Sequence, residues 1–253
     1  MNMESFDRIL FSSNPKYSFE NFVCGESNQL AFDASLAIAH CNDKEMYNPL
    51  ILFAEKPLGK THLLHSIGKE LLQNDQTKRL GFISGSEFTR LYIDYVLENG
   101  DNLFYGYFDS LDVLLFDDIN LLDQSNKMSQ KYIFTIFNRF SSLKRKRVVI
   151  TAGQPVLELE KYGFADNLIS YLNFGKVVKI QPPSLELRLK FLRKRSEQYG
   201  IVLPEEVSVF LANNITSDLR QLEGSIVQMI SEALRRKPNI SLELAKEIFK
   251  EFK

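Results

Sequence analysis

Residues 49–68 read PLILFAEKPLGKTHLLHSIG, and this stretch decides the fold. Its first five residues, Pro49–Phe53, form an apolar run that predicts a strand. Over residues 61–72, apolar side chains recur at the three- and four-residue spacing of one helix face. Between the two lies a turn that contains Pro57 and Gly59. The stretch therefore predicts a strand, a turn and a helix in succession.

The same alternation continues along the chain. Short apolar or β-branched runs predict strands at residues 80–83, 113–116, 148–151 and 177–180, and apolar periodicity predicts helices over 88–97 and 133–140. The run at 113–116 is closed by Asp117 and Asp118, and it is typical of a strand buried on both faces of a parallel sheet. Strands that alternate with helices indicate the α/β class, with a parallel sheet flanked by helices.

The pattern changes at Gln181–Pro183. Beyond it the sequence predicts helices only, over residues 185–199, 205–213, 219–233 and 242–252. Asp218 and Ser241 stand where side chains cap the starts of two of these helices. We therefore expect a leader over 1–13, an α/β base domain over 14–183 and a small all-helical domain over 184–253.

Composition excludes several classes of protein. The 253 residues are 44% hydrophobic and 25% charged, with a net charge of -1. These values exclude a disordered chain and a coiled-coil rod, and they exclude a strongly basic nucleic-acid clamp as a description of the whole chain. Two cysteines are too few for a disulfide scaffold. Neither a signal peptide nor an apolar run long enough to cross a membrane is visible, so we expect a cytoplasmic protein without membrane partners.

The turn before the first helix resembles a phosphate-binding loop. The pattern G-x-x-x-x-G-K-[ST] is matched at Gly59, Lys60 and Thr61, whereas its first glycine is replaced by Ala54. In such a loop the lysine reaches the terminal phosphates and the hydroxyl binds magnesium. Pro57 lacks an N–H donor and Glu55 adds a negative charge. An ordinary turn with a surface lysine therefore stays open as the alternative.

The acidic pair at the end of the 113–116 run supports the phosphate loop. In phosphate-loop proteins, an acid after a neighbouring strand binds the magnesium ion. Asp117 and Thr61 are accordingly the candidate magnesium ligands, with Asp118 beside them. Taken alone, the two acids could simply cap a strand end. Taken with the loop, about fifty residues earlier, they favour a site for a magnesium nucleotide.

Several motifs then recur in the order of one family. They are NPKYSFENFVCGESNQL at 14–30, PLGKTHLLHSIG at 57–68, LDVLLFDDINLL at 111–122, KIQPPSLELRLKFL at 179–192 and LRQLEG at 219–224. Over residues 14–253 the chain resembles the nucleotide-binding domain of the bacterial replication initiator DnaA. The resemblance implies the AAA+ P-loop fold, in which a small helical lid domain follows the α/β base. It also implies ATP or ADP with magnesium as the cofactor.

The resemblance also assigns residues to the nucleotide. It implies that the nucleotide is contacted by Phe22, Val23, Gly59, Lys60, Thr61, His62, Asp117, Asp118 and Arg220. Among these, His62 would have a supporting role. Phe22 and Val23 would flank the adenine. Arg220 matches the arginine that the family's lid directs at the phosphates, although a solvated helix face would give the same pattern.

Three departures from the family bear on activity. The helicase-loading and helix-turn-helix DNA-binding domains of DnaA are not seen, which is the layout of Hda-type regulators. A strand that ends in T-S-D in the family ends here in Thr151–Ala152–Gly153, without the acid. The two positions of the arginine finger are Asn167 and Tyr171. We assign no catalytic residue and expect at most a weak ATPase.

Two other segments leave alternatives open. The run KRKR at 144–147 would suit DNA phosphates without sequence specificity, or it is a solvated turn before a strand. The run DRILF at 7–11 faintly resembles peptides that dock on the sliding clamp, although it lacks their glutamine. An amphipathic tail that packs on its own domain is the alternative for this second run.

Together these features lead to one expectation and two alternatives. We expect a DnaA-like protein that binds adenine nucleotide, hydrolyses it weakly or not at all, and takes part in or regulates chromosomal replication initiation. Its partners would be DnaA or other replication proteins. The first alternative is an interaction module with a dead nucleotide pocket. The second is an initiator-like ATPase that remodels origin DNA.

Overall fold

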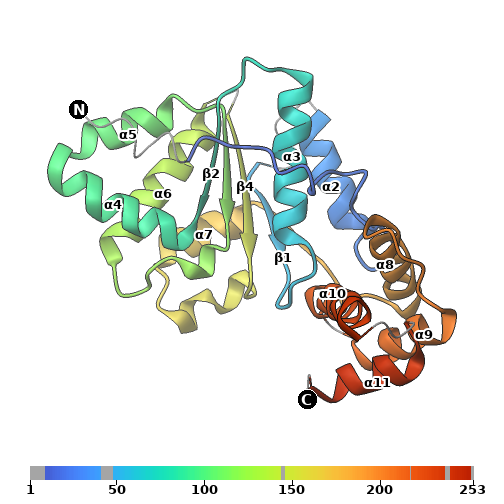
Figure 1. Ribbon diagram of the computed structural model, residues 1–253. Helices are drawn as coiled ribbons and strands as arrows, with labels where there is room; N and C mark the ends of the chain where they lie inside the picture. Colours follow the sequence, from blue (N-terminus) through green and yellow to red (C-terminus); the bar gives the residue numbers. More distant parts are fainter. Residues whose placement is uncertain (1–8, 41–47, 144–145, 217, 237–239, 252–253) are drawn as a thin grey trace. The chain divides into compact units, whose positions relative to one another are not determined.

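The computed structural model describes residues 9–40, 48–143, 146–216, 218–236 and 240–251. The chain divides into two compact units, whose helices and strands are drawn in Figure 1. The α/β unit comprises Met1–Phe22, Leu30–Glu55 and Lys60–Ile180, and the helical unit comprises Val23–Gln29, Lys56–Gly59 and Gln181–Lys253. Each unit therefore combines segments that are distant in the sequence.

A sheet of five parallel strands forms the centre of the α/β unit, in the order β2-β3-β4-β1-β5. The strands are β1 (Leu50–Phe53), β2 (Leu80–Ser84), β3 (Val113–Asp117), β4 (Arg147–Ala152) and β5 (Lys176–Lys179). Every residue of β1 and β3 is buried, as expected for continuous apolar runs inside a parallel sheet. The predicted strands and the α/β class are confirmed.

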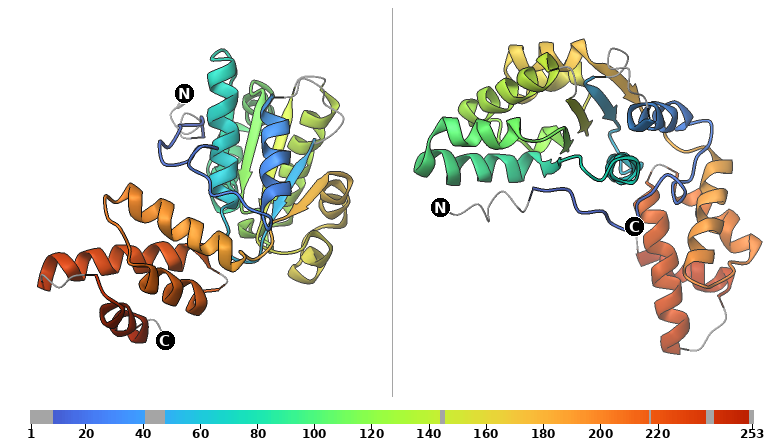
Figure 2. Two further views of the ribbon diagram at one scale, coloured as in Figure 1. Left: turned by 90° about the vertical axis from the view of Figure 1, so that its right-hand side faces the viewer. Right: turned by 90° about the horizontal axis from the view of Figure 1, so that it is seen from above.

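Helices cover both faces of this sheet. They are α2 (Gln29–His40), α3 (Lys60–Asn74), α4 (Gly85–Asn99), α5 (Asp101–Asp109), α6 (Lys127–Ser142) and α7 (Asp166–Phe174), with short 3-10 helices at Ile119–Leu121 and Val156–Tyr162. Helices α2 and α3 lie on one face, and α4, α6 and α7 lie on the other (Figures 1 and 2). The predicted helices are confirmed within α3, α4 and α6, whereas α2, α5 and α7 were not predicted.

Residues 9–11, which lie within the expected leader over 1–13, pair with strand β2. Leu10 forms an antiparallel bridge with Gly81 of β2. The N–H of Phe11 donates to the carbonyl of Leu80 at 2.8 Å, and the N–H of Phe82 donates to the carbonyl of Ile9 at 2.6 Å. This part of the leader therefore pairs with the outer edge of the sheet, because Ile9 and Phe11 are apolar and find partners there.

The helical unit contains α8 (Leu185–Gln198), α9 (Glu205–Asn214), α10 (Leu219–Arg236) and α11 (Leu242–Glu251). The helices expected after residue 183 are thus present. Oδ1 of Asp218 accepts the N–H of Arg220 at 2.8 Å, and Oγ of Ser241 accepts the N–H of Leu244 at 3.3 Å, so both side chains cap helix starts as expected. Among the described residues, none of the helices combines the length and the apolar character needed to cross a membrane.

Candidate functional site

The loop between β1 and α3 ends in a glycine whose backbone conformation suits no other residue well. Gly59 has φ +97°, in a region that L side chains rarely adopt. The chain turns at this residue directly into the first turn of α3. The first N–H groups of a helix have no partner inside it, and the helix dipole makes its start favourable for an anion. A glycine at residue 59 therefore lets α3 present these donors immediately after the loop.

Lys60 and Thr61 are the first two residues of α3. The ammonium group of Lys60 donates to the carbonyl of Ala54 at 2.9 Å. The hydroxyl of Thr61 donates to Oδ2 of Asp117 at 2.9 Å. The structure therefore brings together the loop lysine, the loop threonine and the first acid of β3, which the sequence places 56 residues from Thr61.

Asp117 closes β3 and is held by two hydroxyl groups. It is 9% exposed, and the hydroxyl of Thr151 on the neighbouring strand β4 donates to its Oδ1 at 2.6 Å. Thr61 holds the other carboxylate oxygen. Carboxylate and hydroxyl oxygens are hard donors of the kind that magnesium prefers, and Mg²⁺ usually takes only one or two protein ligands beside phosphate oxygens and water. Thr61 and Asp117 thus fit a magnesium ion that arrives with a nucleotide.

Asp118 adopts a left-handed conformation, with φ +47° and ψ +70°. Its N–H donates to the hydroxyl of Thr151 at 2.7 Å. Non-glycine residues in this conformation are uncommon and cluster at functional sites. Thr151 therefore contacts both acids, as a hydrogen-bond donor to Asp117 and as an acceptor from Asp118.

Asn120 belongs to the same group of residues and was not predicted. Its Oδ1 accepts the N–H of Gly153 at 2.6 Å, just beyond the end of β4. The family resemblance drew attention to Gly153 because an acid is missing there. The sequence signal that could have found Asn120 is its position two residues after the acidic pair, in the turn that leaves β3 at the same edge of the sheet.

His62 and Phe22 pack together within the α/β unit. Nε2 of His62 lies 2.9 Å from the carbonyl oxygen of Ser18, and the ring of Phe22 meets the imidazole edge-on with centroids 5.2 Å apart. Phe22 also stacks on Phe32. Because the side chain of His62 holds the N-terminal segment, any contact with phosphate would come from its main-chain N–H in the first turn of α3.

Val23 and Arg220 belong to the helical unit. The carbonyl of Val23 accepts a hydrogen bond from Nδ2 of Asn28 at 3.0 Å. Arg220 is exposed in the first turn of α10, where Asp218 caps the helix. Apart from Gly59, the residues whose side-chain or ring contacts build the candidate site belong to the α/β unit, and the nucleotide contacts of Val23 and Arg220 stay predictions.

The two positions of the family's arginine finger differ in their surroundings. Asn167 is exposed in the first turn of α7, and its Oδ1 accepts the N–H of Leu168 at 2.8 Å. Tyr171 is buried, lies 2.8 Å from Oγ of Ser141 through its hydroxyl, and stacks on Phe137 with ring centroids 5.4 Å apart. Burial raises the pKa of the Tyr171 hydroxyl above its ordinary value. Tyr171 is thus a core residue.

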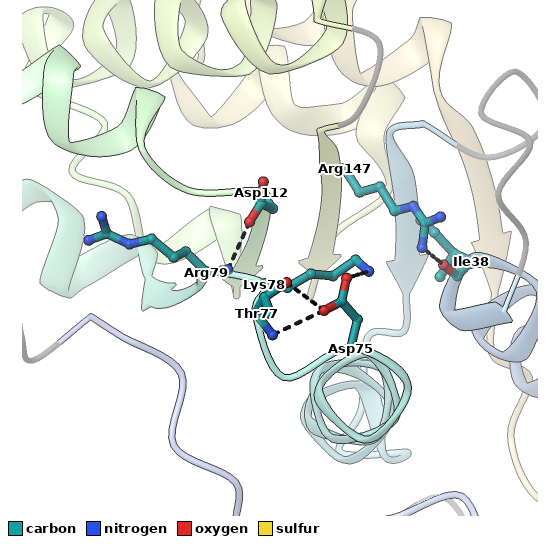
Figure 3. Close-up of polar contacts among 7 residues, drawn as sticks. All are labelled: Ile38, Asp75, Thr77, Lys78, Arg79, Asp112 and Arg147. Carbon is teal, nitrogen blue, oxygen red and sulfur yellow. Dashed lines mark hydrogen bonds and ion pairs between the residues drawn. The ribbon is translucent and has the colours of Figure 1, made fainter.

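The basic run at 144–147 is only partly described, because Lys144 and Arg145 lie outside the described residues. Lys146 donates to the carbonyls of Asp109 and Leu111 at 2.5 Å each, and burial lowers the pKa of its ammonium group. Arg147 donates to the carbonyl of Ile38 at 2.6 Å (Figure 3). Both cations therefore join segments of their own unit, in place of the solvated turn that was one of the two alternatives.

A hollow lies beside Arg147, at the amino ends of β2 and β4, and Figure 3 draws three of its lining residues, Asp75, Lys78 and Arg147. Its volume is about 380 Å³, and Asp75 and Lys78 line it. Asp75 accepts hydrogen bonds from Lys78 and Thr77, which lower the pKa of its carboxyl group to about 2. These charged groups stabilise one another, and they lie at the opposite end of the strands from Asp117.

Residues 9–11 of the run compared with clamp-binding peptides pack on their own unit. The ring of Phe11 contacts His65 and Phe82, with centroids 5.4 Å and 6.3 Å apart, and Ile9 is buried. Asp7 and Arg8 lie outside the described residues. For residues 9–11, the interpretation as a tail that packs on its own domain is confirmed.

Comparisons with known proteins identify the family of this chain. Residues 13–179 match the family described as the bacterial DnaA ATPase domain. The chromosomal replication initiator protein DnaA of Symbiobacterium thermophilum is 35% identical over 96% of this chain and 52% of its own length. The chain thus spans about half the length of this curated relative.

Solved structures show the same relationship. Domain III of the Thermotoga maritima replication initiation protein DnaA matches with a TM-score of 0.87 and 34% identity, over 96% of this chain and 99% of that one. A replication initiator DnaA bound to AMPPCP and single-stranded DNA matches with a TM-score of 0.77 and 29% identity, over 88% of this chain and 68% of that one. The AAA+ P-loop fold is confirmed, and the chain belongs to the bacterial DnaA ATPase-domain family.

Proposed function

We propose that this chain binds an adenine nucleotide with magnesium at the carboxyl edge of its sheet. The observation that carries the proposal is the hydrogen bond between Thr61 and Asp117, which joins the phosphate loop to the acidic strand end. A relative of this chain is a DnaA bound to AMPPCP, an analogue of ATP. The nucleotide would be ATP or ADP.

Different residues would bind the phosphates and the magnesium ion. The start of α3, with the N–H groups of Lys60, Thr61 and His62 following Gly59, offers donors and a favourable dipole to a phosphate. The Lys60 ammonium, which donates to the Ala54 carbonyl in this structure, would donate to a phosphate oxygen when nucleotide is bound. Thr61 and Asp117 would hold magnesium, which neutralises phosphate charge when bound.

We propose that hydrolysis is slow or absent. Gly153 has no side chain to orient a water molecule or contact the terminal phosphate. Tyr171 is buried and Asn167 carries no charge, so neither residue can act as an arginine finger on the nucleotide of a neighbouring molecule. An arginine finger contributes about 10³–10⁵ in rate where it acts. Turnover by this chain would therefore lie far below that of an assembled ATPase.

The biological role that we propose is participation in, or regulation of, chromosomal replication initiation through contacts with DnaA. Its support is membership of the DnaA ATPase-domain family together with the name of the curated relative, a replication initiator. A nucleotide-binding unit without a finger suits a role in which it pairs with an active ATPase. The decisive readout is the rate at which purified DnaA hydrolyses ATP with and without this chain.

Calorimetry with MgADP and MgATP tests the nucleotide site. Lys60→Ala removes the ammonium group, and Lys131→Ala is the matched control because Lys131 is exposed on α6. We expect the unchanged chain and the control to bind alike. We expect Lys60→Ala to bind at least about tenfold more weakly, as loss of a charge-assisted hydrogen bond predicts. Flat titrations of the unchanged chain, or equal affinities in all three proteins, would contradict the proposal.

An interaction module with a dead pocket is the second candidate function. Glu55 places a carboxylate in the loop, and Pro57 removes one of its N–H donors. This candidate predicts no bound nucleotide in the purified protein and no titration with either nucleotide. An effect on DnaA turnover that persists in Lys60→Ala would favour it.

An initiator-like remodeller would contact DNA. One relative is a DnaA bound to single-stranded DNA, which motivates a binding assay with single strands of unrelated sequence. A contact with the sliding clamp through residues 7–11 would require Ile9 and Phe11 to leave the edge of β2. A pull-down with and without residues 1–12 measures the contribution of this segment.

A further inference from the structure

Asn120 lies in a turn that is tightly constrained. The turn begins at Asp118, in its left-handed conformation, and contains the 3-10 helix Ile119–Leu121. Gly85, at the start of α4, packs so closely on it that an added Cβ would lie 2.6 Å from the main-chain nitrogen of Leu122 and 2.8 Å from the carbonyl oxygen of Asp118. The backbone that carries Asn120 is therefore held by main-chain contacts.

The carboxamide of Asn120 has a defined orientation. Its Oδ1 accepts the N–H of Gly153 at 2.6 Å, and only the oxygen of a carboxamide can accept. The amide nitrogen Nδ2 therefore points elsewhere. A Cβ built on Gly153 would lie 2.6 Å from Nδ2, so this nitrogen fills the space that a side chain at residue 153 would occupy.

This position adjoins the phosphate loop. The residue before Gly153, Ala152, accepts the N–H of Ala54 at 3.1 Å through its carbonyl. The carbonyl of Ala54 in turn accepts the Lys60 ammonium at 2.9 Å. A short series of hydrogen bonds thus connects the residue beside Asn120 to the lysine of the loop.

The amide nitrogen still has hydrogen-bonding capacity. Nδ2 carries two N–H donors, and within the part of the chain that the structure describes no group accepts from it. Asp117 and Thr61 stand at the same edge of the sheet. A fixed, neutral donor at the edge of the sheet that also carries the lysine and the acid suits an anionic oxygen.

We infer that Asn120 contacts the terminal phosphate of a bound nucleoside triphosphate and makes this site discriminate triphosphate from diphosphate. The inference rests on the proposed nucleotide site and adds a specificity-determining residue to it. Nδ2 donates a hydrogen bond to an oxygen that a triphosphate has and a diphosphate lacks. Asn120 supplies this contact from the turn after β3, because Gly153 supplies no side chain after β4.

The test compares the affinities for MgADP and for Mg-AMPPCP, a triphosphate analogue, by calorimetry. Asn120→Ala removes both the donor and the acceptor of the carboxamide. Asn120→Asp keeps an oxygen for the N–H of Gly153 but replaces the donor by a carboxylate oxygen. Asn138→Asp, at an exposed position of α6, is the matched control for the added charge.

We expect Asn120→Ala to bind Mg-AMPPCP about tenfold more weakly, a typical loss for one hydrogen bond to a charged group, while MgADP changes less than about twofold. Asn120→Asp loses at least as much affinity for the triphosphate analogue, since its carboxylate repels the phosphate. A purely structural role predicts the opposite: Asn120→Asp binds like the unchanged protein, and Asn120→Ala loses affinity for both ligands together with thermal stability.

The outcomes separate the two proposals. If the unchanged chain binds neither nucleotide, the proposed function fails and the role of Asn120 fails with it. If the unchanged chain binds both ligands, and the ratio of their affinities is the same in all four proteins, only the role of Asn120 is overturned. A ratio that changes in both Asn120 variants and not in Asn138→Asp supports the inference.

Discussion

The hydroxyl of Thr151 donates to Oδ1 of Asp117 at 2.6 Å, and Thr151 is completely buried. The bond joins the ends of two neighbouring strands, and the same hydroxyl oxygen accepts the N–H of Asp118. One carboxylate oxygen of Asp117 is therefore held by β4, while the other meets Thr61. Thr151 fixes the direction in which the acid faces the loop.

Replacing this hydroxyl should destabilise the protein and weaken magnesium-dependent binding. Thr151→Val keeps the shape but removes the shorter of the two hydroxyl contacts to Asp117 and leaves the N–H of Asp118 without its acceptor. Unsatisfied buried polar groups cost about 1–3 kcal/mol in the free energy of unfolding. Urea unfolding measures the loss. Thr151→Ser retains the hydroxyl and should lose less, so equal losses in the two variants would contradict this account.

A side chain at residue 153 should conflict with Asn120. Gly153→Asp places its Cβ about where Nδ2 of Asn120 lies, so the carboxamide must move and lose the Gly153 N–H. We expect a loss of about 1–3 kcal/mol in the free energy of unfolding, as for other overpacked sites.

A double-mutant cycle checks this conflict. In Asn120→Ala the space is empty, so adding Gly153→Asp to that variant should cost clearly less than adding it to the unchanged protein. Urea unfolding of the four proteins gives the coupling free energy. Additive losses would show that residues 120 and 153 do not compete for space.

Mild acid should weaken the contact between α3 and the N-terminal segment. The imidazole of His65 lies among the rings of Phe11, Tyr17 and Phe82, and burial lowers its pKa from the ordinary 6.5. The unfolded chain then binds a proton more readily than the folded one. The free energy of unfolding therefore falls as pH drops below about 6.5 towards the folded-state pKa.

His65→Phe should remove this part of the pH dependence. Urea unfolding at pH 7.5 and pH 5.5 measures it, with His40→Phe as the control because His40 is exposed. We expect the fall in stability between these pH values to shrink in His65→Phe and to persist in His40→Phe. An unchanged fall in His65→Phe would assign the acid sensitivity to other groups.

The strands of the sheet were predicted well because their sequences have a clear apolar pattern. Continuous apolar runs such as Val113–Phe116 have few alternatives to a buried parallel strand. Helix α2 was not predicted because most of its buried residues are alanine or serine, as at Ala31 and Ser35, which give a weak apolar pattern. Only Gly100 separates helix α5 from α4, so the sequence contains no loop long enough to indicate that a second helix begins there.

The residues of the candidate site that belong to a sequence motif were predicted. The residues that only the tertiary structure brings to the site were missed. Lys60, Thr61 and Asp117 stand in patterns that can be found along the chain. The roles of Thr151 and Asn120 depend on which strands are neighbours and on the left-handed turn at Asp118. Neither the strand order nor this turn is marked by residue type, so only the structure brings these side chains together.

The two finger positions should respond differently to arginine. Tyr171→Arg places a charge in the core against Phe137, where burial without a counter-charge costs about 3–5 kcal/mol. Tyr171→Phe loses the hydroxyl contacts with Ser141 and with the carbonyl of Phe137, at about 1 kcal/mol. Residue 167 is exposed, so Asn167→Arg should cost only about 1 kcal/mol in the free energy of unfolding, for the lost contact with the N–H of Leu168.

Asn167→Arg is thus the variant in which an arginine can be restored without unfolding the chain. If the chain pairs with DnaA through the finger-bearing helix α7, this variant should raise the rate at which DnaA hydrolyses ATP, whereas Asn167→Gln should not. Phosphate release by DnaA, with each variant added in excess, measures the effect. Equal rates with arginine and glutamine at residue 167 would place the contact with DnaA on another surface. A Tyr171→Arg protein as stable as Asn167→Arg would refute the burial argument separately.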